Sequence, residues 1–412
     1  MSTYLLTAGV VPQKVEISLP LSKSISNRAL LMNALSPCPA DIEYAKCDDA
    51  DSMLAALNSE DDYVNIGAAG TAMRFLTAYF ATRQGYTVTL DGSERMRKRP
   101  ISPLVNALRT LGADIEYAGE EGFPPLRITG KKLVGGNVEI NAGISSQFIS
   151  ALMMIGPTMS RPLTIKLCGS QISRPYIEMT ASLMRRFGIA VDVKEAEINI
   201  GCGEYSIHDF KIEPDWSAAT YWYETVAMTG AEIRLNALEK QSLQGDSQTA
   251  KLFSRFGVET KFICDNEFSG ATVSPVQREE GRAEIDLGSM PDTAQTFAVM
   301  LCLMGVPYTI TGLSTLPNKE TDRLSALRNE LKKLGYIVTI SGGDTLIWDG
   351  DTAEPTFETI DTYKDHRMAM AFAPAVFKFK TLKINDIGVV SKSYPTFWDD
   401  LAKMGVTIKE VE

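Results

Sequence analysis

A short segment near the N-terminus carries residue types that suit a bound anion. It reads Ser22-Lys23-Ser24-Ile25-Ser26-Asn27-Arg28. On a helix, Ser24 and Arg28 lie four residues apart on one face, with Lys23 where the helix begins. A hydroxyl, an ammonium and a guanidinium group together bind phosphate or carboxylate well. The same residues also fit an N-cap serine followed by a solvent-reaching arginine, so this segment alone leaves both interpretations open.

Similar chemistry recurs along the chain. A helix N-terminus presents unpaired N–H groups and the positive end of the helix dipole, which favours anions. Several such ends gathered in one site would bind a highly anionic small molecule. Singly, each candidate also fits an ordinary cap or a solvated helix face. The further candidates are Gly70-Thr71-Ala72-Met73-Arg74, Arg95 and Arg99, Ser145-Ser146-Gln147, Ser173 with Tyr176, Asp292, Lys319-Glu320-Thr321-Asp322-Arg323, Asp365-His366-Arg367 and Lys392.

The expected helix openings indicate an internal repeat. After the first, they recur at intervals of roughly 70 to 77 residues, which is typical of a repeated supersecondary unit. Six helices are expected to open at Ser24, Gly70, Ser145, Asp215, Asp292 and Asp365.

A second helix in each repeat is expected to end on a glycine. Glycine is the usual left-handed residue after a helix, and Asn is its common substitute. Asn58, after Met53 and Leu57, therefore supplies the sixth copy, in a shortened first repeat that is expected to lack a hairpin. The five glycine endings are Leu108/Leu111/Gly112, Met184/Phe187/Gly188, Phe253/Phe256/Gly257, Leu331/Leu334/Gly335 and Leu401/Met404/Gly405.

The repeats predict two domains. Three repeats run to about Lys211, and an extended crossing follows because Pro214 disfavours helix at Glu213. Strand-like residues 4–7 and 14–19 precede the first repeat, and we expect this segment to complete the last sheet of the second domain. The expected domains are residues 21–212 and residues 1–20 plus 213–412, with three repeats each. The two chain crossings would form a hinge, and closure on a ligand would exclude water.

Composition excludes several classes of function. The chain has 412 residues, 44% of them hydrophobic, and a net charge of −10, which argues against nucleic-acid binding. Its six cysteines lie far apart without a C-x-x-C motif, and it has only two histidines, so we expect reduced thiols and no metal site. The N-terminus carries no signal pattern, and the longest apolar run is too short to span a bilayer. We expect a cytoplasmic protein.

Taken together, the motifs resemble those of the 5-enolpyruvylshikimate-3-phosphate (EPSP) synthases, a family of enolpyruvyl transferases. The resemblance runs from Leu19 to about Pro395 and rests on an ordered set of motifs. It implies an α/β (α+β) fold with two hinged lobes, each of three βαβαββ units. It also implies transfer of the enolpyruvyl group of phosphoenolpyruvate to shikimate 3-phosphate, without a cofactor, in chorismate and aromatic amino acid biosynthesis. The strings that carry it are Ser22–Arg28, Ala69–Arg74, Arg95 to Pro100, Ser145–Gln147, Lys319–Arg323 and Asp365–Met370.

The resemblance also assigns roles to residues. It implies that Lys23, Ser24, Arg28, Ser145, Ser146, Gln147, Ser173, Asp292 and Lys319 bind shikimate 3-phosphate. It implies that Lys23, Gly70, Arg95, Gln147, Arg323, Arg367 and Lys392 bind phosphoenolpyruvate. The two substrates bring two phosphates and two carboxylates, which suits a densely cationic site. We expect a monomer, because such an enzyme needs no partner to complete its site.

The implied reaction breaks a C–O bond, so it does not require a metal on the phosphate. A proton must reach the methylene carbon of phosphoenolpyruvate while the sugar-ring hydroxyl loses one, and the tetrahedral intermediate then loses phosphate and a methyl proton. Carboxylates beside lysines can supply this acid–base chemistry. Our hypothesis is that Asp292 takes the hydroxyl proton, Glu320 handles the methyl proton, and Lys23 and Lys392 stabilise or protonate the phosphate.

Some positions depart from the family pattern, and two other functions stay open. Ala68 and Phe75 replace the more usual Asn and Pro beside the implied phosphoenolpyruvate site, and Thr315 replaces an Asn that would contact the shikimate ring. One alternative is the related transferase that acts on UDP-N-acetylglucosamine, which usually carries a reactive loop cysteine and an Asn after its first Lys, where this chain has Ser24. The other is an anion-binding homologue without activity, which should have lost some of these acids or cations.

Overall fold

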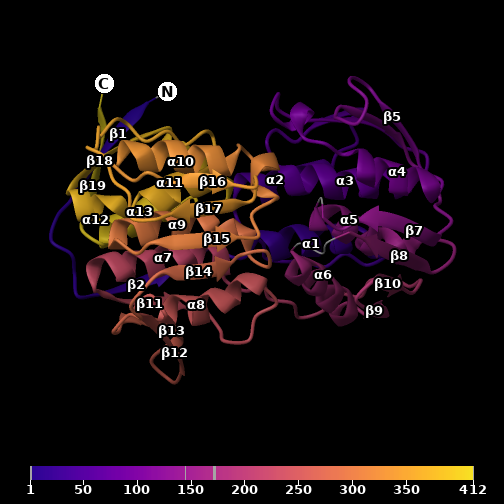
Figure 1. The fold of residues 1–412 in the computed structure, drawn as a ribbon. Coiled ribbons are helices and arrows are strands. Elements are labelled where there is room, and N and C mark those ends of the chain that lie inside the picture. Colours follow the sequence, from indigo (N-terminus) through magenta and orange to yellow (C-terminus); the bar gives the residue numbers. More distant parts are fainter. Residues whose placement is uncertain (1, 144, 170–172, 412) are drawn as a thin grey trace. The chain divides into compact units, whose positions relative to one another are not determined.

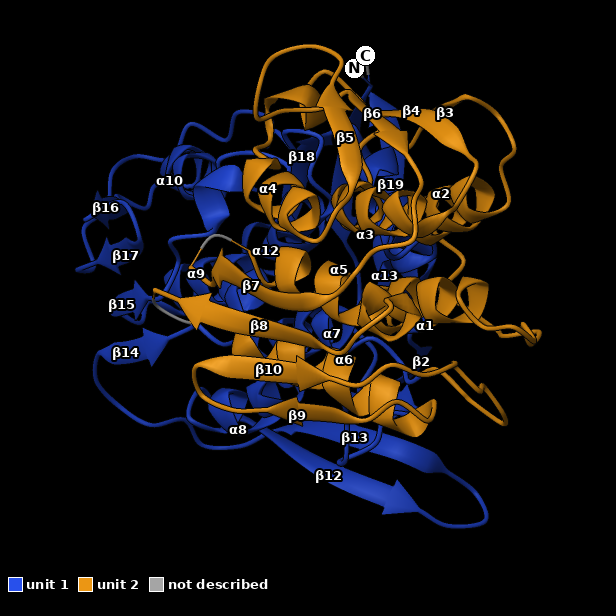
Figure 2. Ribbon diagram, turned by 90° about the vertical axis from the view of Figure 1, so that its right-hand side faces the viewer, with its two compact units in different colours: residues 1–21, 213–412 blue, residues 22–212 orange. Residues whose placement is uncertain are grey.

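The computed structural model describes residues 2–143, 145–169 and 173–411. They form two compact units, coloured separately in Figure 2. The N-terminal unit contains residues 22–212, and the discontinuous unit contains residues 1–21 and 213–412. Leu21 belongs to the discontinuous unit, one residue beyond the expected boundary, because it forms an antiparallel bridge with Pro214.

The N-terminal unit contains two four-stranded sheets of identical strand order. In each sheet the first two strands are parallel, and the following hairpin adds two antiparallel strands in the order first-second-fourth-third. A helix follows each of the first two strands, so each sheet belongs to a βαβαββ repeat (Figure 1). The strands are β3 (Tyr63–Asn65), β4 (Thr87–Asp91), β5 (Asp114–Tyr117) and β6 (Leu126–Thr129), then β7 (Gly136–Asn141), β8 (Leu163–Cys168), β9 (Val191–Val193) and β10 (Glu197–Ile200).

The discontinuous unit repeats the same strand order in two more sheets. They are β2-β11-β13-β12 and β14-β15-β17-β16, each with a parallel first pair. A third sheet has the order β18-β1-β19. The strands are β1 (Thr3–Ala8), β2 (Lys14–Ser18), β11 (Glu232–Asn236), β12 (Val258–Cys264), β13 (Ser269–Pro275), β14 (Ala283–Asp286), β15 (Tyr308–Thr311), β16 (Thr339–Ser341), β17 (Thr345–Trp348), β18 (Thr381–Asn385) and β19 (Val406–Val411).

The N-terminal segment serves two sheets, whereas we expected it to complete only the last one. The expectation is confirmed for β1, which lies between β18 and β19 (Figure 1). It is wrong for β2, which pairs in parallel with β11 and so supplies the first strand of the fourth repeat. Both assignments follow from the repeat, because β1 takes the place of a fourth strand and β2 the place of a first strand.

The first repeat departs further from the pattern than expected. Residues 22–62, all of which are described, form two helices and no strand, so the repeat lacks its whole sheet rather than one hairpin. The expected left-handed ending at Asn58 is also wrong, because this residue has φ −92° and ψ −1°. Asn tolerates the left-handed conformation but does not require it. At the five glycine endings φ lies between 82° and 99°, as predicted (Gly112, Gly188, Gly257, Gly335 and Gly405).

The helices form two series that match the predicted openings and endings. Three openings are capped by side chains, because Ser145, Asp215 and Asp365 each accept a hydrogen bond from a backbone N–H of the first turn. The first series is α1 (Lys23–Ala34), α3 (Gly70–Thr82), α5 (Ser146–Ile155), α7 (Trp216–Thr229), α9 (Ala294–Met304) and α11 (His366–Phe372). The second is α2 (Asp48–Leu57), α4 (Ser102–Thr110), α6 (Arg174–Arg186), α8 (Thr249–Ser254), α10 (Arg323–Lys333) and α13 (Phe397–Lys403), and α12 (Ala375–Phe379) is additional.

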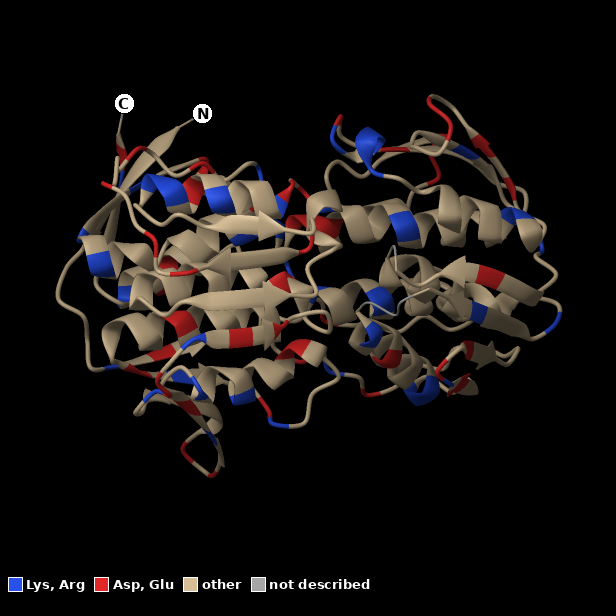
Figure 3. Cartoon of the chain, in the orientation of Figure 1, with Lys and Arg blue, Asp and Glu red and all other residues tan. Residues whose placement is uncertain are grey.

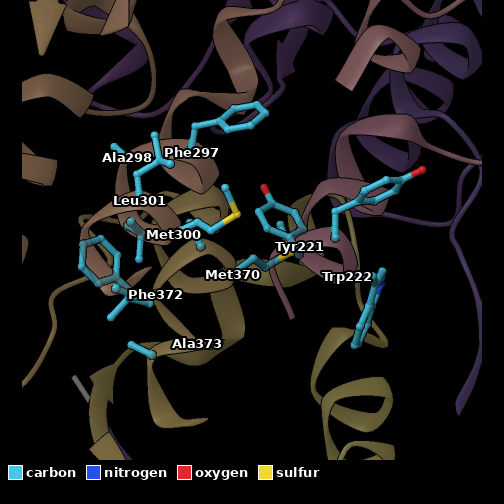
Figure 4. Close-up of a cluster of buried hydrophobic side chains, with 14 of the residues drawn as sticks. Tyr221, Trp222, Phe297, Ala298, Met300, Leu301, Met370, Phe372 and Ala373 are labelled. Atoms are coloured by element: carbon cyan, nitrogen blue, oxygen red, sulfur yellow. The ribbon is translucent and has the colours of Figure 1, made fainter. Parts of the chain in front are cut away.

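Helices of the first series are buried on most of their sides. Helices α5, α7 and α9 are largely apolar, as such burial requires, whereas α1 also buries Ser26, Asn27 and Arg28. In the discontinuous unit, Tyr221 and Trp222 of α7 pack in one cluster with Phe297 of α9 and Met370 of α11 (Figure 4). This burial fixes the three helices against one another. It thereby fixes the positions of their N-termini, where the candidate residues lie.

Candidate functional site

Helix α1 of the N-terminal unit begins at Lys23, whose side chain is paired with an acid that the sequence did not reveal. Lys23 Nζ donates to Asp49 Oδ2 at 2.9 Å. Asp49 is buried in the first turn of α2, where a carboxylate is stabilised by the helix N-terminus. The acidic run Asp48-Asp49 was the only available signal for this contact. The pair orients the ammonium group of Lys23.

Arg28, also on α1, is a buried cation without an acidic partner in the described part of the chain. It is 2% exposed, and its guanidinium donates to Thr180 Oγ1 at 2.7 Å, Ser24 O at 2.9 Å and Ser150 Oγ at 3.1 Å. Its carbon Cζ lies 5.3 Å from the centre of the Phe75 ring. Burial lowers the pKa of Arg28 to about 10. A charge held in this way would gain from an anion brought by a ligand.

The N-termini of α3 and α5 meet through side chains. Gln147 Nε2 donates to Thr71 Oγ1 at 3.0 Å, and Ser145 Oγ accepts from the Gln147 backbone N–H at 3.3 Å. Ser146 is buried at the first position of α5. These contacts assemble hydroxyl, amide and backbone N–H groups at two adjacent helix ends.

Gly70 at the start of α3 lies in close contact with the end of the Arg99 side chain. A Cβ atom at position 70 would lie 2.4 Å from Arg99 Nη1. Arg99 is buried, whereas Arg95, which the sequence analysis assigned to phosphoenolpyruvate, is exposed. Ser173 is buried at the N-cap of α6 with φ 59°, a left-handed conformation that is uncommon for serine and clusters at functional sites.

In the discontinuous unit, Asp292 lies among three cations. Its carboxylate is 3.1 Å from Lys319 Nζ, 2.9 Å from Arg323 Nη1 and 3.2 Å from Arg367 Nη2. Burial alone would raise the pKa of Asp292, but the charges of Lys319, Arg367 and Arg323 outweigh it and hold the pKa well below its usual range. In this arrangement Asp292 is a charged acceptor with little tendency to take a proton.

Arg323 joins three carboxylates. It is 1% exposed, and its Nε donates to Asp365 Oδ2 at 2.7 Å, while its two terminal nitrogens reach Asp292 and Glu320 at 2.9 and 3.0 Å. Burial opposes its charge, yet the three acids raise the pKa of Arg323 further above its ordinary value. Glu320 also accepts from Lys392 Nζ at 3.3 Å. These contacts link Asp292, Glu320 and Lys392, three of the four residues expected to act in catalysis.

Asp246 is a buried acid beside this cluster that the sequence analysis missed. Its carboxylate accepts a hydrogen bond from Ser217 Oγ at the start of α7. Burial raises the pKa of Asp246 to about 6, and the charge of Asp292 adds to the effect while Arg367 opposes it. No motif marked this residue, since its position depends on the loop after β11.

The structure therefore gathers the predicted residues within each unit. In the N-terminal unit, eight of them lie at or next to the first turns of helices α1, α3, α5 and α6: Lys23, Ser24, Arg28, Gly70, Ser145, Ser146, Gln147 and Ser173. In the discontinuous unit, ion pairs join six of them: Asp292, Lys319, Glu320, Arg323, Arg367 and Lys392. No group of three or more His, Cys, Asp and Glu side chains is placed to hold a metal within the described residues. No helix in the described ranges is long and apolar enough to cross a membrane.

Known proteins resemble this chain over most of its length. Residues 56–401 match the family described as EPSP synthase (3-phosphoshikimate 1-carboxyvinyltransferase). A protein from Bacteroides fragilis named 3-phosphoshikimate 1-carboxyvinyltransferase is 46% identical over 98% of both chains. A protein of the same name from Vibrio atlanticus is 37% identical over 96% of this chain and 98% of its own.

Solved structures share the fold. The EPSP synthase from Acinetobacter baumannii superposes with a TM-score of 0.75 over the whole of both chains, at 20% sequence identity. The predicted α/β fold class is thereby confirmed. Given the family match over most of its length and the near-complete alignment with relatives well above 30% identity, the chain belongs to the EPSP synthase family.

Proposed function

We propose that this protein is a 3-phosphoshikimate 1-carboxyvinyltransferase. It transfers the enolpyruvyl group of phosphoenolpyruvate to the 5-hydroxyl of shikimate 3-phosphate and releases phosphate, a step toward chorismate and the aromatic amino acids. The observation that carries the proposal is the Asp292 cluster, in which two carboxylates, Asp292 and Glu320, are interleaved with Lys319, Arg323, Arg367 and Lys392. A reaction between two polyanions that also moves protons needs both kinds of group.

The N-terminal unit supplies the groups that suit shikimate 3-phosphate. Arg28 is a buried cation whose charge no acid balances in the described residues, and Ser145, Ser146 and Ser173 bring hydroxyl or N–H groups at helix starts. Lys23, Ser24 and Gln147 complete the set on this unit, and Asp292 and Lys319 on the other unit bind the same substrate.

Phosphoenolpyruvate is assigned to Lys23, Gly70, Arg95, Gln147, Arg323, Arg367 and Lys392. Arg323 is the least available of these residues. Four of the five N–H bonds that a guanidinium offers already point at Asp365, Asp292 and Glu320, so it can give the substrate at most one more. Its larger contribution is to hold these three acids in place. Arg367 and Lys392 are then the main anion-binding side chains.

The proposed reaction begins when Lys319 and Arg367 exchange the Asp292 carboxylate for the substrate anions. When substrate anions draw Lys319 and Arg367 away from Asp292, its pKa rises toward the ordinary value, so the carboxylate becomes able to accept the proton of the 5-hydroxyl. The hydroxyl oxygen bonds to C2 of phosphoenolpyruvate, and Glu320 delivers a proton to the methylene carbon. In the second step the methyl group returns a proton to Glu320 and the C2–O bond to phosphate breaks. Lys23 and Lys392 stabilise the departing phosphate, and one of them protonates its new oxyanion. The proton that Asp292 took from the hydroxyl replaces the one that the lysine gave up, so the protein ends the reaction as it began.

A phosphate-release assay tests the proposed function. Purified protein is mixed with phosphoenolpyruvate and shikimate 3-phosphate, and in a second arm with phosphoenolpyruvate and UDP-N-acetylglucosamine. We expect phosphate only in the first arm. Release in the second arm alone would assign the related sugar-nucleotide activity, and release in neither arm would indicate an anion-binding homologue without activity.

We also propose that the protein acts in the cytoplasm as a monomer. All residues assigned to the substrates come from one chain, so no second copy is needed to complete the set. Light scattering after size-exclusion chromatography should give a mass near 45.1 kDa, the mass of one chain.

A further inference from the structure

Two consecutive residues just before Asp365 adopt a backbone conformation that side chains disfavour. Tyr363 has φ 53° and Lys364 has φ 56°. In this left-handed region the Cβ atom of an L-residue approaches the following carbonyl oxygen, so residues other than Gly, Asn and Asp seldom adopt it. Two such residues in succession persist only where surrounding contacts hold them.

The contacts come from Glu330, a fully buried carboxylate on α10. Glu330 Oε1 accepts from the Tyr363 hydroxyl at 2.6 Å, and Oε2 accepts from the Asp361 backbone N–H at 2.9 Å. Lys333 balances its charge at 2.7 Å and also donates to Thr359 O at 2.9 Å. One acid therefore holds the chain just before the left-handed pair, at Asp361, and at its first member, Tyr363.

The same helix holds the end of this segment. Arg323 at the start of α10 binds Asp365, and Glu330 lies two helical turns later, about 10 Å along the same face. The charged positions of α10 can be followed in Figure 3. Asp365 in turn accepts from the backbone N–H of Arg367 at 3.0 Å, and the Arg367 guanidinium reaches Asp292 at 3.2 Å. The position of Arg367 thus depends on a strained turn that α10 fixes at both ends.

We propose that Glu330 is a positioning residue for the reaction. By holding Tyr363 and Asp361 it keeps the left-handed turn in place, and the turn sets where the Arg367 guanidinium meets phosphoenolpyruvate. The inference rests on the proposed function for the identity of that substrate. It does not rest on it for the geometry, which involves only the turn, Asp365 and Arg367.

The first test is Glu330→Gln, which keeps the shape but has one acceptor oxygen where the carboxylate has two. Its amide oxygen can accept from the Asp361 N–H, but the amide NH2 then faces Tyr363, whose hydroxyl loses the charged acceptor that Glu330 provides. We expect KM for phosphoenolpyruvate to rise about tenfold, equivalent to 1.4 kcal/mol, while KM for shikimate 3-phosphate stays within about twofold. Glu354→Gln is the matched control, because Glu354 is an exposed glutamate earlier in the same connection, and it should behave as wild type. Tyr363→Phe is a milder second variant should Glu330→Gln fold poorly.

Rescue separates positioning from a general loss of stability. Lys364 is exposed, and glycine adopts the left-handed conformation without penalty, so Lys364→Gly removes part of the strain that Glu330 opposes. In the Glu330→Gln background, Lys364→Gly should restore much of the lost affinity for phosphoenolpyruvate. Lys364→Ala removes the same charge but keeps the Cβ atom, and it should restore nothing.

Hydrogen exchange gives a measurement that does not depend on activity. The amides of Asp365 and Arg367 are bonded to Thr362 O and Asp365 Oδ1, and in Glu330→Gln we expect them to exchange about tenfold faster. If wild type releases no phosphate from the two substrates, the proposed function fails while these exchange rates still decide the role of Glu330. Unchanged exchange and an unchanged KM in Glu330→Gln overturn the proposal, and so does a defect that Lys364→Gly leaves as it was.

Discussion

Replacing Asp292 by Asn should separate binding from catalysis, because this residue does two opposed things. Its carboxylate is the proposed acceptor of the hydroxyl proton, and it also occupies Lys319 and Arg367, which the substrates need. Asn cannot accept the proton, so kcat should fall about 10²- to 10⁴-fold, the usual contribution of a general base. The affinity for phosphoenolpyruvate should stay the same or increase.

The size of the gain in affinity follows from the ion pairs. Unit charges 4 Å apart interact by about 4 kcal/mol at an effective dielectric constant of 20. Asp292 is 3.1 and 3.2 Å from the two cations, but the three side chains are 10–23% exposed, so water weakens each pair. A substrate anion must displace the carboxylate from these cations, and removing the competitor should return about 1 kcal/mol. KM for phosphoenolpyruvate, which is assigned to Arg367, is then expected to fall up to about fivefold.

Steady-state phosphate release gives kcat and KM, and calorimetric titration with phosphoenolpyruvate in the presence of shikimate 3-phosphate gives affinity directly. Asp351→Asn is the matched control, because Asp351 is exposed on the same unit, and it should leave both constants unchanged. Wild-type turnover in Asp292→Asn would remove this residue from the proton transfer. A KM that rises in step with the loss of kcat would show instead that Asp292 mainly binds substrate.

Three further changes should act in predictable directions. Arg28→Met removes a buried charge, and the Ser150 and Thr180 hydroxyls keep each other as partners at 2.9 Å. Tm should therefore stay the same or rise, while KM for shikimate 3-phosphate increases about 10- to 100-fold. A loss of Tm that accompanies the rise in KM would contradict this account. Gly70→Ala should displace the Arg99 guanidinium, because the new Cβ atom would lie 2.4 Å from it. KM for phosphoenolpyruvate should rise about tenfold, while Tm stays within about 2 °C of the wild-type value. An unchanged KM would show that Arg99 does not assist binding. Asp246 has a pKa near 6 when folded and near 3.9 when unfolded, so its contribution to stability is complete below pH 4 and is lost as the pH rises through 6. Denaturation of Asp246→Asn and wild type should show the difference in stability moving by about 2 kcal/mol in favour of the variant between pH 4 and pH 7. An equal difference at both pH values would refute the raised pKa.

Local patterns in the sequence predicted the elements that have local causes. Gly112 and Gly188 end their helices in the left-handed conformation because the chain reverses there, and Ser145 caps α5 because a serine hydroxyl reaches the first turn. The same argument gave a wrong prediction at Asn58, because an asparagine can end a helix in the right-handed or the left-handed conformation. The family resemblance predicted βαβαββ units, but β2 was assigned to the wrong sheet because strand pairing depends on distant partners.

The sequence predicted the cations of the candidate site, but it did not predict the side chains that contact them. Lys23, Arg28 and Arg367 belong to recognisable motifs, so their residue types and positions predict anion binding. Their neighbours come from far along the chain, as with Thr180, which is 152 residues from Arg28. Asp246 carries no local signal, and for Asp49 the acidic run Asp48-Asp49 is the only one. The residue types therefore predicted that the site binds anions. Which acid pairs with which cation could be seen only in the folded structure.

The place of β1 between β18 and β19 has a consequence for biosynthesis. Thr3 pairs with Val411, so the first strand to leave the ribosome must wait for the last one. At 5–20 residues per second the delay is roughly 20–80 s. During that time the N-terminal unit, which is continuous in sequence, can fold by itself, whereas β1 stays an unsatisfied strand edge open to chaperones or to aggregation. Nascent chains stalled before β18 should accordingly be cut by protease within residues 3–13, which contain β1, and resist it in the N-terminal unit.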